Sequence, residues 1–217
     1  MTPTITGFTW VPEFARGFVR DIRPRWAFEE AGQAYAVDLI DGDYVKSQTH
    51  RRFQPFGQIP TYRDDKVEIF ESGAMVMYIC ETAGVLTPAD TAARMRAVQW
   101  LIAALNSVEP FVMALVVNDI FEADRDWSKK RHDKVVEDLN GRLKDLSGAI
   151  GDQQTLDGGD FTYGDLMMVS VLGGLRGTGV LDSFPNLASY VARGEARPAH
   201  QKAMADHLAS FNDAQAA

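Results

Sequence analysis

The chain has 217 residues, a formal net charge of −8, 46% hydrophobic residues and 24% charged residues. This is the composition of an ordinary globular protein that is long enough to bury a substantial core. The acidic balance argues against a nucleic-acid partner, because proteins that bind nucleic acids usually carry a basic surface. The single cysteine, Cys80, excludes an intramolecular disulfide and any site that needs two thiolates. It lies in an apolar run, which predicts a buried structural thiol.

Targeting and metal signals are not found in the sequence. No secretory leader is recognised, and no run approaches the ~18 apolar residues of a membrane span, so we expect no membrane association. None of the four histidines stands at a metal-ligand spacing, and therefore no metal is expected. A reducing, cytoplasmic location is the expectation that fits these features.

The first part of the chain predicts a strand, a helix and a second strand. The strands are Thr4–Trp10 and Ala34–Ile40. The helix between them is expected from Ile22 to Ala31, with Asp21 as its N-cap and Gly32 just beyond its end. Such close succession favours parallel pairing of the two strands.

A hairpin and a second helix complete the first domain. Two strands, Ile59–Arg63 and Lys66–Phe70, flank the turn residues Asp64-Asp65, which predicts a tight hairpin. The next helix is expected over Glu71–Glu81, with Gly84 as its stop signal. The order βαβ-ββα is that of an α/β thioredoxin-like domain, which we assign to residues 1–83.

Residues 88–217 predict an all-α C-terminal helical domain. Ala89–Phe121 shows apolar residues at helical spacing, with Thr87 as a possible cap and a kink at Pro110. A second long helix is expected over Trp127–Ile150.

A capping box is expected further along the helical domain. Thr162 is followed three residues later by Asp165, before an apolar helix. This spacing predicts a structural role for Asp165, which would nucleate the helix, rather than a catalytic one.

The run Gly57-Gln58-Ile59-Pro60, followed by Glu71-Ser72, resembles the glutathione-binding signature of glutathione S-transferases. The capping box and the closing helices around Pro185 and Tyr190 are similar to that family as well, so the resemblance covers essentially the whole chain. The chain resembles cytosolic, bacterial-looking members of the family. The resemblance does not indicate a class within the family. The resemblance implies a homodimer that uses glutathione as a co-substrate.

The resemblance also implies how glutathione is held. In that family the proline, here Pro60, is cis, and the residue before it, Ile59, pairs through its backbone with the cysteinyl unit. Glu71 and Ser72 would meet the γ-glutamyl end; for Ser72, helix capping is a compatible second role.

Two further contacts are expected by analogy. Gln58 is a candidate for a side-chain contact with glutathione. Arg51 would meet the glycine carboxylate, and Arg52 is an alternative. A solvated arginine pair is the other interpretation of these two residues.

The sequence departs from the family at the residue that activates the thiol. Such enzymes usually place a Tyr, Ser or Cys just after the first strand, yet none occurs between Trp10 and Arg25. In one interpretation Arg20, or Arg16, stabilises the thiolate together with free N–H groups at the helix start. In the other, the arginines are solvated or pair with nearby acids such as Asp21. Trp10 either contacts the ligand or fills a domain interface.

The acceptor site is expected between the domains, lined from the first loop and the long helix. Its candidate residues are Val11, Phe14, Asn106, Pro110, Phe111 and Met113. The implied reaction is attack of the glutathione thiolate on a small hydrophobic electrophile, as in detoxification, or related glutathione-dependent chemistry. The alternative is a non-catalytic protein that uses the same fold to bind a partner. Retention of Glu71-Ser72 opposes this alternative, and the missing hydroxyl supports it.

Overall fold

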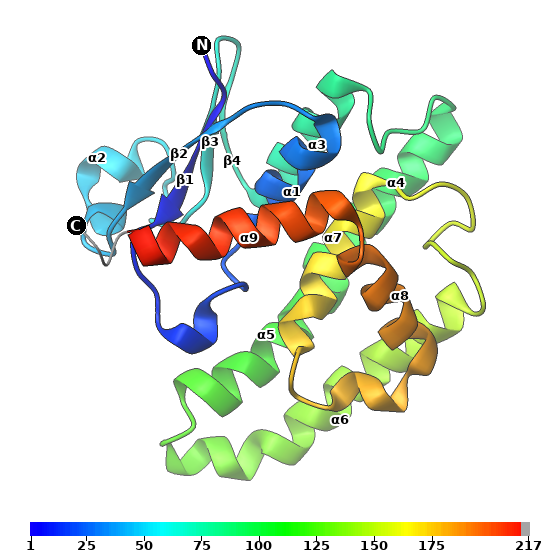
Figure 1. The fold of residues 1–217 in the computed structure, drawn as a ribbon. Helices are drawn as coiled ribbons and strands as arrows, with labels where there is room; N and C mark the ends of the chain where they lie inside the picture. Colours follow the sequence, from blue (N-terminus) through cyan, green and yellow to red (C-terminus); the bar gives the residue numbers. More distant parts are fainter. Residues whose placement is uncertain (214–217) are drawn as a thin grey trace. The chain divides into compact units, whose positions relative to one another are not determined.

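The computed structural model describes residues 1–213 and divides the chain into two compact units (Figure 1). Unit 1 contains Met1–Leu86 together with the chain from Ala196 onward, and unit 2 contains Thr87–Glu195. The last helix was predicted as part of the helical domain, but it packs against the first helix inside unit 1. Unit 1 is therefore made from two segments that lie far apart in the sequence.

Unit 1 is built on a four-stranded sheet in the order β2-β1-β3-β4. Strands β1 and β2 pair in parallel, whereas β3 is antiparallel to both of its neighbours. This arrangement confirms the predicted βαβ-ββα order. The elements are β1 (Thr4–Phe8), α1 (Ile22–Ala31), β2 (Ala36–Ile40), α2 (Gln48–Arg51), β3 (Thr61–Arg63), β4 (Glu68–Phe70), α3 (Ser72–Ala83) and α9 (Pro198–Asp213), with short 3-10 turns at Glu13–Ala15 and Tyr44–Lys46.

Helix α1 has the predicted ends, but one of them forms differently than expected. Gly32 follows the last turn with φ of 59°, a left-handed conformation that glycine adopts at little cost. Asp21 occupies the N-cap position, yet its side chain makes no capping bond. Its carboxylate instead accepts from Nε of Arg25 at 2.8 Å. The prediction of a side-chain cap at Asp21 was wrong, because Oδ2 is held by Arg25 and His207 and the N–H groups of Ile22 and Arg23 donate to Val19 and Arg20.

The sheet of unit 1 is covered on one face by α1 and α3. The ring of Tyr62 on β3 stacks on Phe28 of α1 at 6.0 Å and meets the edge of Tyr78 of α3 at 5.6 Å. The other face bears a cavity of about 370 Å³ between the strands and the segment that contains Tyr44 and His50. Its lining includes neither Glu71 nor Ser72, so this hollow is separate from the predicted glutathione site.

The β3–β4 hairpin has a longer turn than predicted. The strands end at Arg63 and begin again at Glu68, and the backbone N–H of Asp64 donates to the carbonyl of Val67. The carboxylate of Asp64 accepts from the N–H groups of Lys66 and Val67, at 2.7 and 2.8 Å. This side-chain bonding organises the turn, which explains why the two-residue turn expected from Asp64-Asp65 does not form.

Stability at low pH is expected to depend on Asp64. Partial burial raises the pKa of Asp64, but hydrogen bonds from Val67, Lys66, Tyr62 and Tyr78 outweigh it and lower the pKa from 3.8 to about 2. The carboxylate therefore contributes stability above pH 3.8, and this contribution is lost as the pH falls towards about 2. Urea unfolding at several pH values should show that Asp64→Asn removes this dependence. Replacement of the exposed Asp133 by Asn should leave it; equal acid sensitivity in wild type and Asp64→Asn would contradict the prediction.

The single cysteine is buried in α3, as the sequence predicts. Burial, helped by the charges of Glu30 and Glu81, raises the pKa of the Cys80 thiol to about 12. A thiol-specific reagent at neutral pH is therefore expected to leave the native protein unlabelled and to label one thiol per chain in urea. Rapid stoichiometric labelling of the native protein would show that Cys80 is accessible.

Unit 2 is helical, as predicted, and its longest run is one continuous helix with two distortions. Ala104–Val108 and Val117–Phe121 are π-helical segments. In the first of them Glu109 donates to the carbonyl of Ala104, just before Pro110, so the wider turn absorbs the missing N–H of the proline. The elements are α4 (Thr91–Ala103), α5 (Glu109–Val116), α6 (Asp126–Ile150), α7 (Tyr163–Leu172) and α8 (Pro185–Glu195), with 3-10 turns at Gly173–Leu175 and Val180–Ser183.

Of the two helix caps predicted in unit 2, one forms and the other does not. The first long helix begins at Thr91, where Asp90 accepts from the N–H of Ala93; the predicted cap at Thr87 was wrong. Before α7, Thr162 and Asp165 form the predicted capping box. Asp165 is 1% exposed and is held by the protein around it, in agreement with its structural role.

One helix in the described part of the chain is long and apolar enough to cross a membrane, by length and composition alone. It is Thr91–Phe121, with a mean hydropathy of 1.8 over its most apolar window. The expectation that no run reaches this length was wrong. A helix that packs into a protein core passes the same test, and here Leu101, Val108 and Val112 are buried within unit 2.

Candidate functional site

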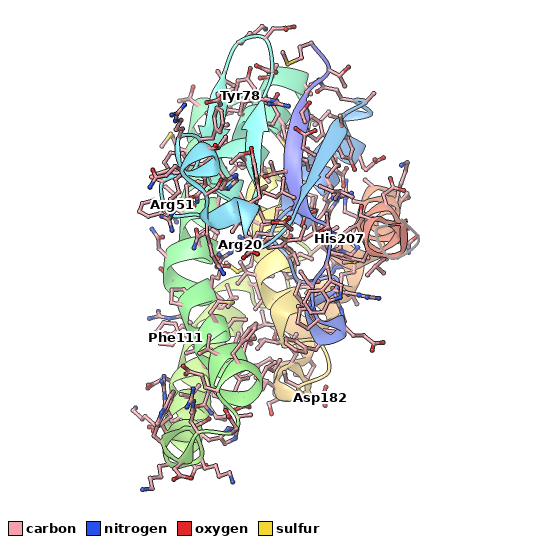
Figure 2. All side chains as sticks on the ribbon, turned by 90° about the vertical axis from the view of Figure 1, so that its left-hand side faces the viewer. Arg20, Arg51, Tyr78, Phe111, Asp182 and His207 are labelled. Carbon is pink, nitrogen blue, oxygen red and sulfur yellow. The ribbon has the colours of Figure 1, made fainter. Side chains whose placement is uncertain are left out.

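The strand register brings the predicted glutathione-binding residues to one end of the sheet. Ile5 of β1 faces Tyr62 of β3, so the chain before β3 runs back alongside the end of β1. Thr61 of β3 faces Phe70 of β4, which places Glu71 and Ser72 next to the start of β3. The end of β1, the Ile59-Pro60 segment and the first turn of α3 therefore share one edge. In Figure 2, Arg20 and Arg51 lie towards the same end of unit 1, and Tyr78 lies towards the other.

The Ile59-Pro60 bond is cis, as the resemblance implies. Ile59 is 7% exposed, and within residues 1–213 its backbone N–H and C=O make no hydrogen bond. An unpaired backbone beside a strand can accept another extended segment as a pairing partner. This is the arrangement that the predicted contact with a cysteinyl unit requires.

The loop before Ile59 is braced by three side chains. Gln54, 3% exposed, accepts from the N–H groups of Phe56 and Gln58 at 2.7 and 3.2 Å. Nε2 of His50 donates to the carbonyl of Gln58 at 2.7 Å. Arg51 closes the other side of the loop. These contacts fix the backbone of the loop just before Ile59.

Arg51 holds the backbone of the loop, a role that its predicted contact with the glycine carboxylate did not include. Its Nη1 donates to the carbonyl of Pro55 at 2.9 Å, and its Nε donates to the carbonyl of Lys46 at 3.3 Å. Gly57 has φ of 63°, a conformation that strains other residues, and a Cβ there would also stand 3.2 Å from the carbonyl oxygen of Val45 and 2.9 Å from Nη2 of Arg51. A contact between Arg51 and the glycine carboxylate stays a prediction. Gln58 likewise has its side-chain oxygen near Gln54, at 3.4 Å from Nε2.

Glu71 and Ser72 form the most distinctive part of the site. Glu71 has φ of 73°, a conformation that side chains other than glycine rarely adopt and that costs about 1–3 kcal/mol. Such strain persists where the surrounding structure enforces it, and it is concentrated at ligand sites. The exposed Glu71 carboxylate stands at the start of α3, where no side chain caps the first turn. The helix N-terminus thus presents N–H groups beside a carboxylate.

A buried arginine completes this corner. Arg23 of α1 is 5% exposed, and its Nη1 donates to Oγ of Ser72 at 3.0 Å. Because this oxygen already accepts from Arg23, the Ser72 proton is directed to another acceptor. A ligand that carries one carboxylate and one ammonium group finds opposite charges here, with Ser72 and Arg23 for the carboxylate and Glu71 for the ammonium.

The start of α1, which follows the loop after β1, does not offer the free backbone N–H groups that one prediction assumed. The N–H of Ile22 donates to Val19, that of Arg23 donates to Arg20, and Pro24 has none. The prediction of free N–H groups at the start of α1 was therefore wrong. Arg20 is half-buried and Trp10 is 59% exposed, two residues beyond the end of β1. Their roles in thiol activation stay predictions.

The candidate acceptor residues belong to different units. Val11 is buried and Phe14 is 47% exposed in unit 1. In unit 2, Asn106 is exposed, and the ring of Phe111 lies 4.9 Å below the guanidinium of Arg142. An acceptor site built from both sets stays a prediction. Among residues 1–213, no group of three or more His, Cys, Asp or Glu side chains is arranged to hold a metal.

Three residues of this site were not singled out from the sequence. Arg23 is one of several arginines in its segment, and its partner Ser72 lies 49 positions away. His50 and Gln54 act on backbone groups a few residues ahead of them. A glutamine just before Pro55-Phe56-Gly57 is a local signal for such a loop brace, whereas no local signal exists for Arg23.

Comparisons with known proteins agree with this geometry. The chain matches the family model for the glutathione S-transferase N-terminal domain over residues 15–81. It is 27% identical over 187 residues to a glutathione S-transferase of Hyoscyamus muticus, with 77% of this chain and 83% of that protein covered. It is 28% identical over 188 residues to a probable glutathione S-transferase of Oryza sativa subsp. japonica, with 80% and 86% covered.

Solved structures share the fold. A glutathione transferase family member from Pseudomonas fluorescens, with two glutathione bound, superimposes with a TM-score of 0.82 at 19% identity, over 94% of this chain and 92% of that one. A poplar glutathione transferase gives 0.79 at 21% identity, over 95% and 98%. With the cis Ile59-Pro60 bond and the Glu71-Ser72 corner in place, the domain match over residues 15–81 and the curated relatives support a member of the glutathione S-transferase family of enzymes.

Proposed function

We propose that the chain binds glutathione and transfers its thiolate to a small hydrophobic electrophile. The observation that carries this proposal is the corner at the start of α3. There, Arg23 is bonded to Ser72 next to the strained, exposed Glu71. The unpaired backbone of Ile59 lies at the same edge of the sheet, ready for the cysteinyl unit. Binding of glutathione by the Pseudomonas fluorescens relative supports the same assignment.

Thiol activation is the second part of the proposed function. A free thiol with a pKa near 8.5 is only partly ionised at neutral pH, so an enzyme must stabilise the thiolate. We assign this role to the charge of Arg20, with Trp10 beside the reacting groups. The N–H groups at the start of α1 are already bonded, which leaves side-chain charge as the means available in this loop.

The second candidate is a non-catalytic glutathione-binding protein. It is favoured by one observation: the loop from Trp10 to Arg25 contains no Tyr, Ser, Thr or Cys, and no helix N–H groups substitute for them. In this case the chain would hold glutathione without lowering the pKa of its thiol.

Two measurements separate these functions. Titration calorimetry should show glutathione binding, and absence of binding at millimolar ligand would refute both. The ultraviolet absorbance of the bound thiolate against pH should then show a thiol pKa well below 8.5 in the wild type. Arg20→Ala should restore the ordinary pKa, whereas Arg125→Ala, which removes an exposed arginine of unit 2, should not. An ordinary pKa in the wild type would favour the non-catalytic protein.

We also propose that the chain acts as a homodimer in the cytoplasm. Met95 and Ile102 expose 58% and 48% of their surface on α4, which supports burial of this helix against another chain. A reducing compartment would keep the thiol of glutathione available. Sedimentation at micromolar protein should give twice the monomer mass; a monomer under these conditions would refute the dimer.

A further inference from the structure

The loop between β1 and α1 is tied to the last helix of the chain by one hydrogen bond. The N–H of Gly17, in the middle of this loop, donates to Nε2 of His207 on α9 at 3.2 Å. Gly17 is buried with φ of 84°, and His207 is fully buried. The contact joins residues 190 positions apart (Figure 2 labels His207). It is formed within unit 1.

The surroundings fix the tautomer and the orientation of this imidazole. Because Gly17 is the donor, Nε2 of His207 carries the lone pair and Nδ1 carries the proton. That proton points to Oδ2 of Asp21, 3.2 Å away, and the same oxygen accepts from Nε of Arg25. The ring of Phe211 packs against the imidazole edge at 5.0 Å. Asp21, 1% exposed, therefore holds His207 in the form that can accept from Gly17.

We propose that His207 is a positioning residue, which through Gly17 fixes the loop that carries Arg16 and Arg20 at the end of β1. The inference rests on the proposed function for its chemical consequence, because this loop is where thiol activation is assigned. Arg16 adds a second contact to the same helix, with its guanidinium 5.8 Å from the centre of the Phe211 ring. Asp21 acts by orienting His207 and touches no reacting group.

The position of α9 does not depend on this bond. Arg197 forms two bonds to Glu30 of α1, at 2.6 and 2.8 Å. His200 meets the ring of Trp26 at 4.6 Å, and Ser210 accepts from Arg25 at 3.2 Å. Loss of the Gly17 contact therefore frees the loop and leaves the helix docked.

Two amide substitutions separate the two nitrogens of His207. In His207→Gln, the amide oxygen reaches the place of Nε2 and still accepts from Gly17. In His207→Asn, the shorter amide reaches Asp21 in the place of Nδ1, and the bond to Gly17 is lost. Ser210→Ala is the control, because it removes a contact between α9 and α1 that does not involve the loop.

Hydrogen exchange of the Gly17 amide, measured without ligand, tests the anchor itself. Exchange should become about tenfold faster in His207→Asn, the loss expected for one buried hydrogen bond. It should stay close to the wild-type rate in His207→Gln and Ser210→Ala. Equal rates in His207→Asn and Ser210→Ala would overturn the proposal, whether or not the protein binds glutathione.

The thiol of bound glutathione tests the consequence. The affinity for glutathione, measured at a pH at which the bound thiol is protonated, should be unchanged in all three variants, because Glu71 and Ser72 are untouched. The thiol pKa should rise towards 8.5 in His207→Asn alone, and kcat at neutral pH should fall in this variant only. A wild-type protein that does not bind glutathione would refute the proposed function, and the Gly17 exchange rates would then decide the anchor by themselves. Unchanged thiol ionisation in His207→Asn would refute the positioning role.

Discussion

Replacement of Ser72 by Ala is expected to weaken glutathione binding about 10- to 100-fold, the effect of one lost hydrogen bond to a charged group. The Ser72 oxygen accepts from Arg23, which leaves the hydroxyl proton available for the carboxylate of the proposed ligand. Its removal takes away one donor to the ligand and also leaves a donor of the 5% exposed Arg23 without this partner. Titration calorimetry with reduced glutathione measures the change in affinity.

The matched control for Ser72→Ala is Ser210→Ala on α9 of the same unit. It also removes a serine hydroxyl that accepts from a buried arginine, here Arg25, but it leaves the start of α3 intact. It should bind glutathione with the wild-type affinity. If Ser72→Ala also binds like the wild type while remaining folded by circular dichroism, the corner at the start of α3 is not the γ-glutamyl site.

The largest effect on stability is expected at Asp165. Its two oxygens accept from the backbone N–H groups of Leu156 and Thr162, and the Tyr190 hydroxyl donates to it at 3.0 Å. Asp165→Ala leaves these buried donors unpaired and opens the capping box, which should lower the free energy of unfolding by at least about 3 kcal/mol. Burial, together with the Asp165 charge, raises the pKa of Tyr190, so its hydroxyl remains a donor throughout the neutral range.

Urea unfolding followed by far-ultraviolet circular dichroism measures this loss. Thr162→Ser keeps the capping oxygen and should differ from the wild type by less than about 0.5 kcal/mol. A loss of under about 1 kcal/mol in Asp165→Ala would mean that water replaces the missing carboxylate.

Local features of the fold could be predicted from the sequence because their causes lie a few residues apart. Helix α1 runs from Ile22 to Ala31 as expected, since Gly32 ends it whatever surrounds it. The capping box of Asp165 likewise needs only its own turn. Where two local signals compete, the prediction failed: Thr87-Pro88 and Asp90 both suit a helix start, and the structure begins the helix after Asp90.

Contacts between distant residues could not be predicted in the same way. No periodicity connects Arg23 with Ser72 or Gly17 with His207, because the partners meet only after the sheet and α9 have formed. The failed N-cap at Asp21 has the same origin, since its carboxylate is held by Arg25 and His207. The predicted binding residues follow a short motif and could be named from the sequence, whereas the loop that carries Arg20 is held by tertiary contacts such as the bond from Gly17 to His207.

The two-segment construction of unit 1 also determines the order in which the protein is completed during synthesis. The sheet, α1 and α3 leave the ribosome first, but the helix that buries His207 against Asp21 is translated after unit 2. Until then, the carboxylate of Asp21 and the amide of Gly17 lack their partner from α9. The first unit to emerge is therefore finished only when the whole of unit 2 has been made, so a chain interrupted within unit 2 has an incomplete glutathione domain.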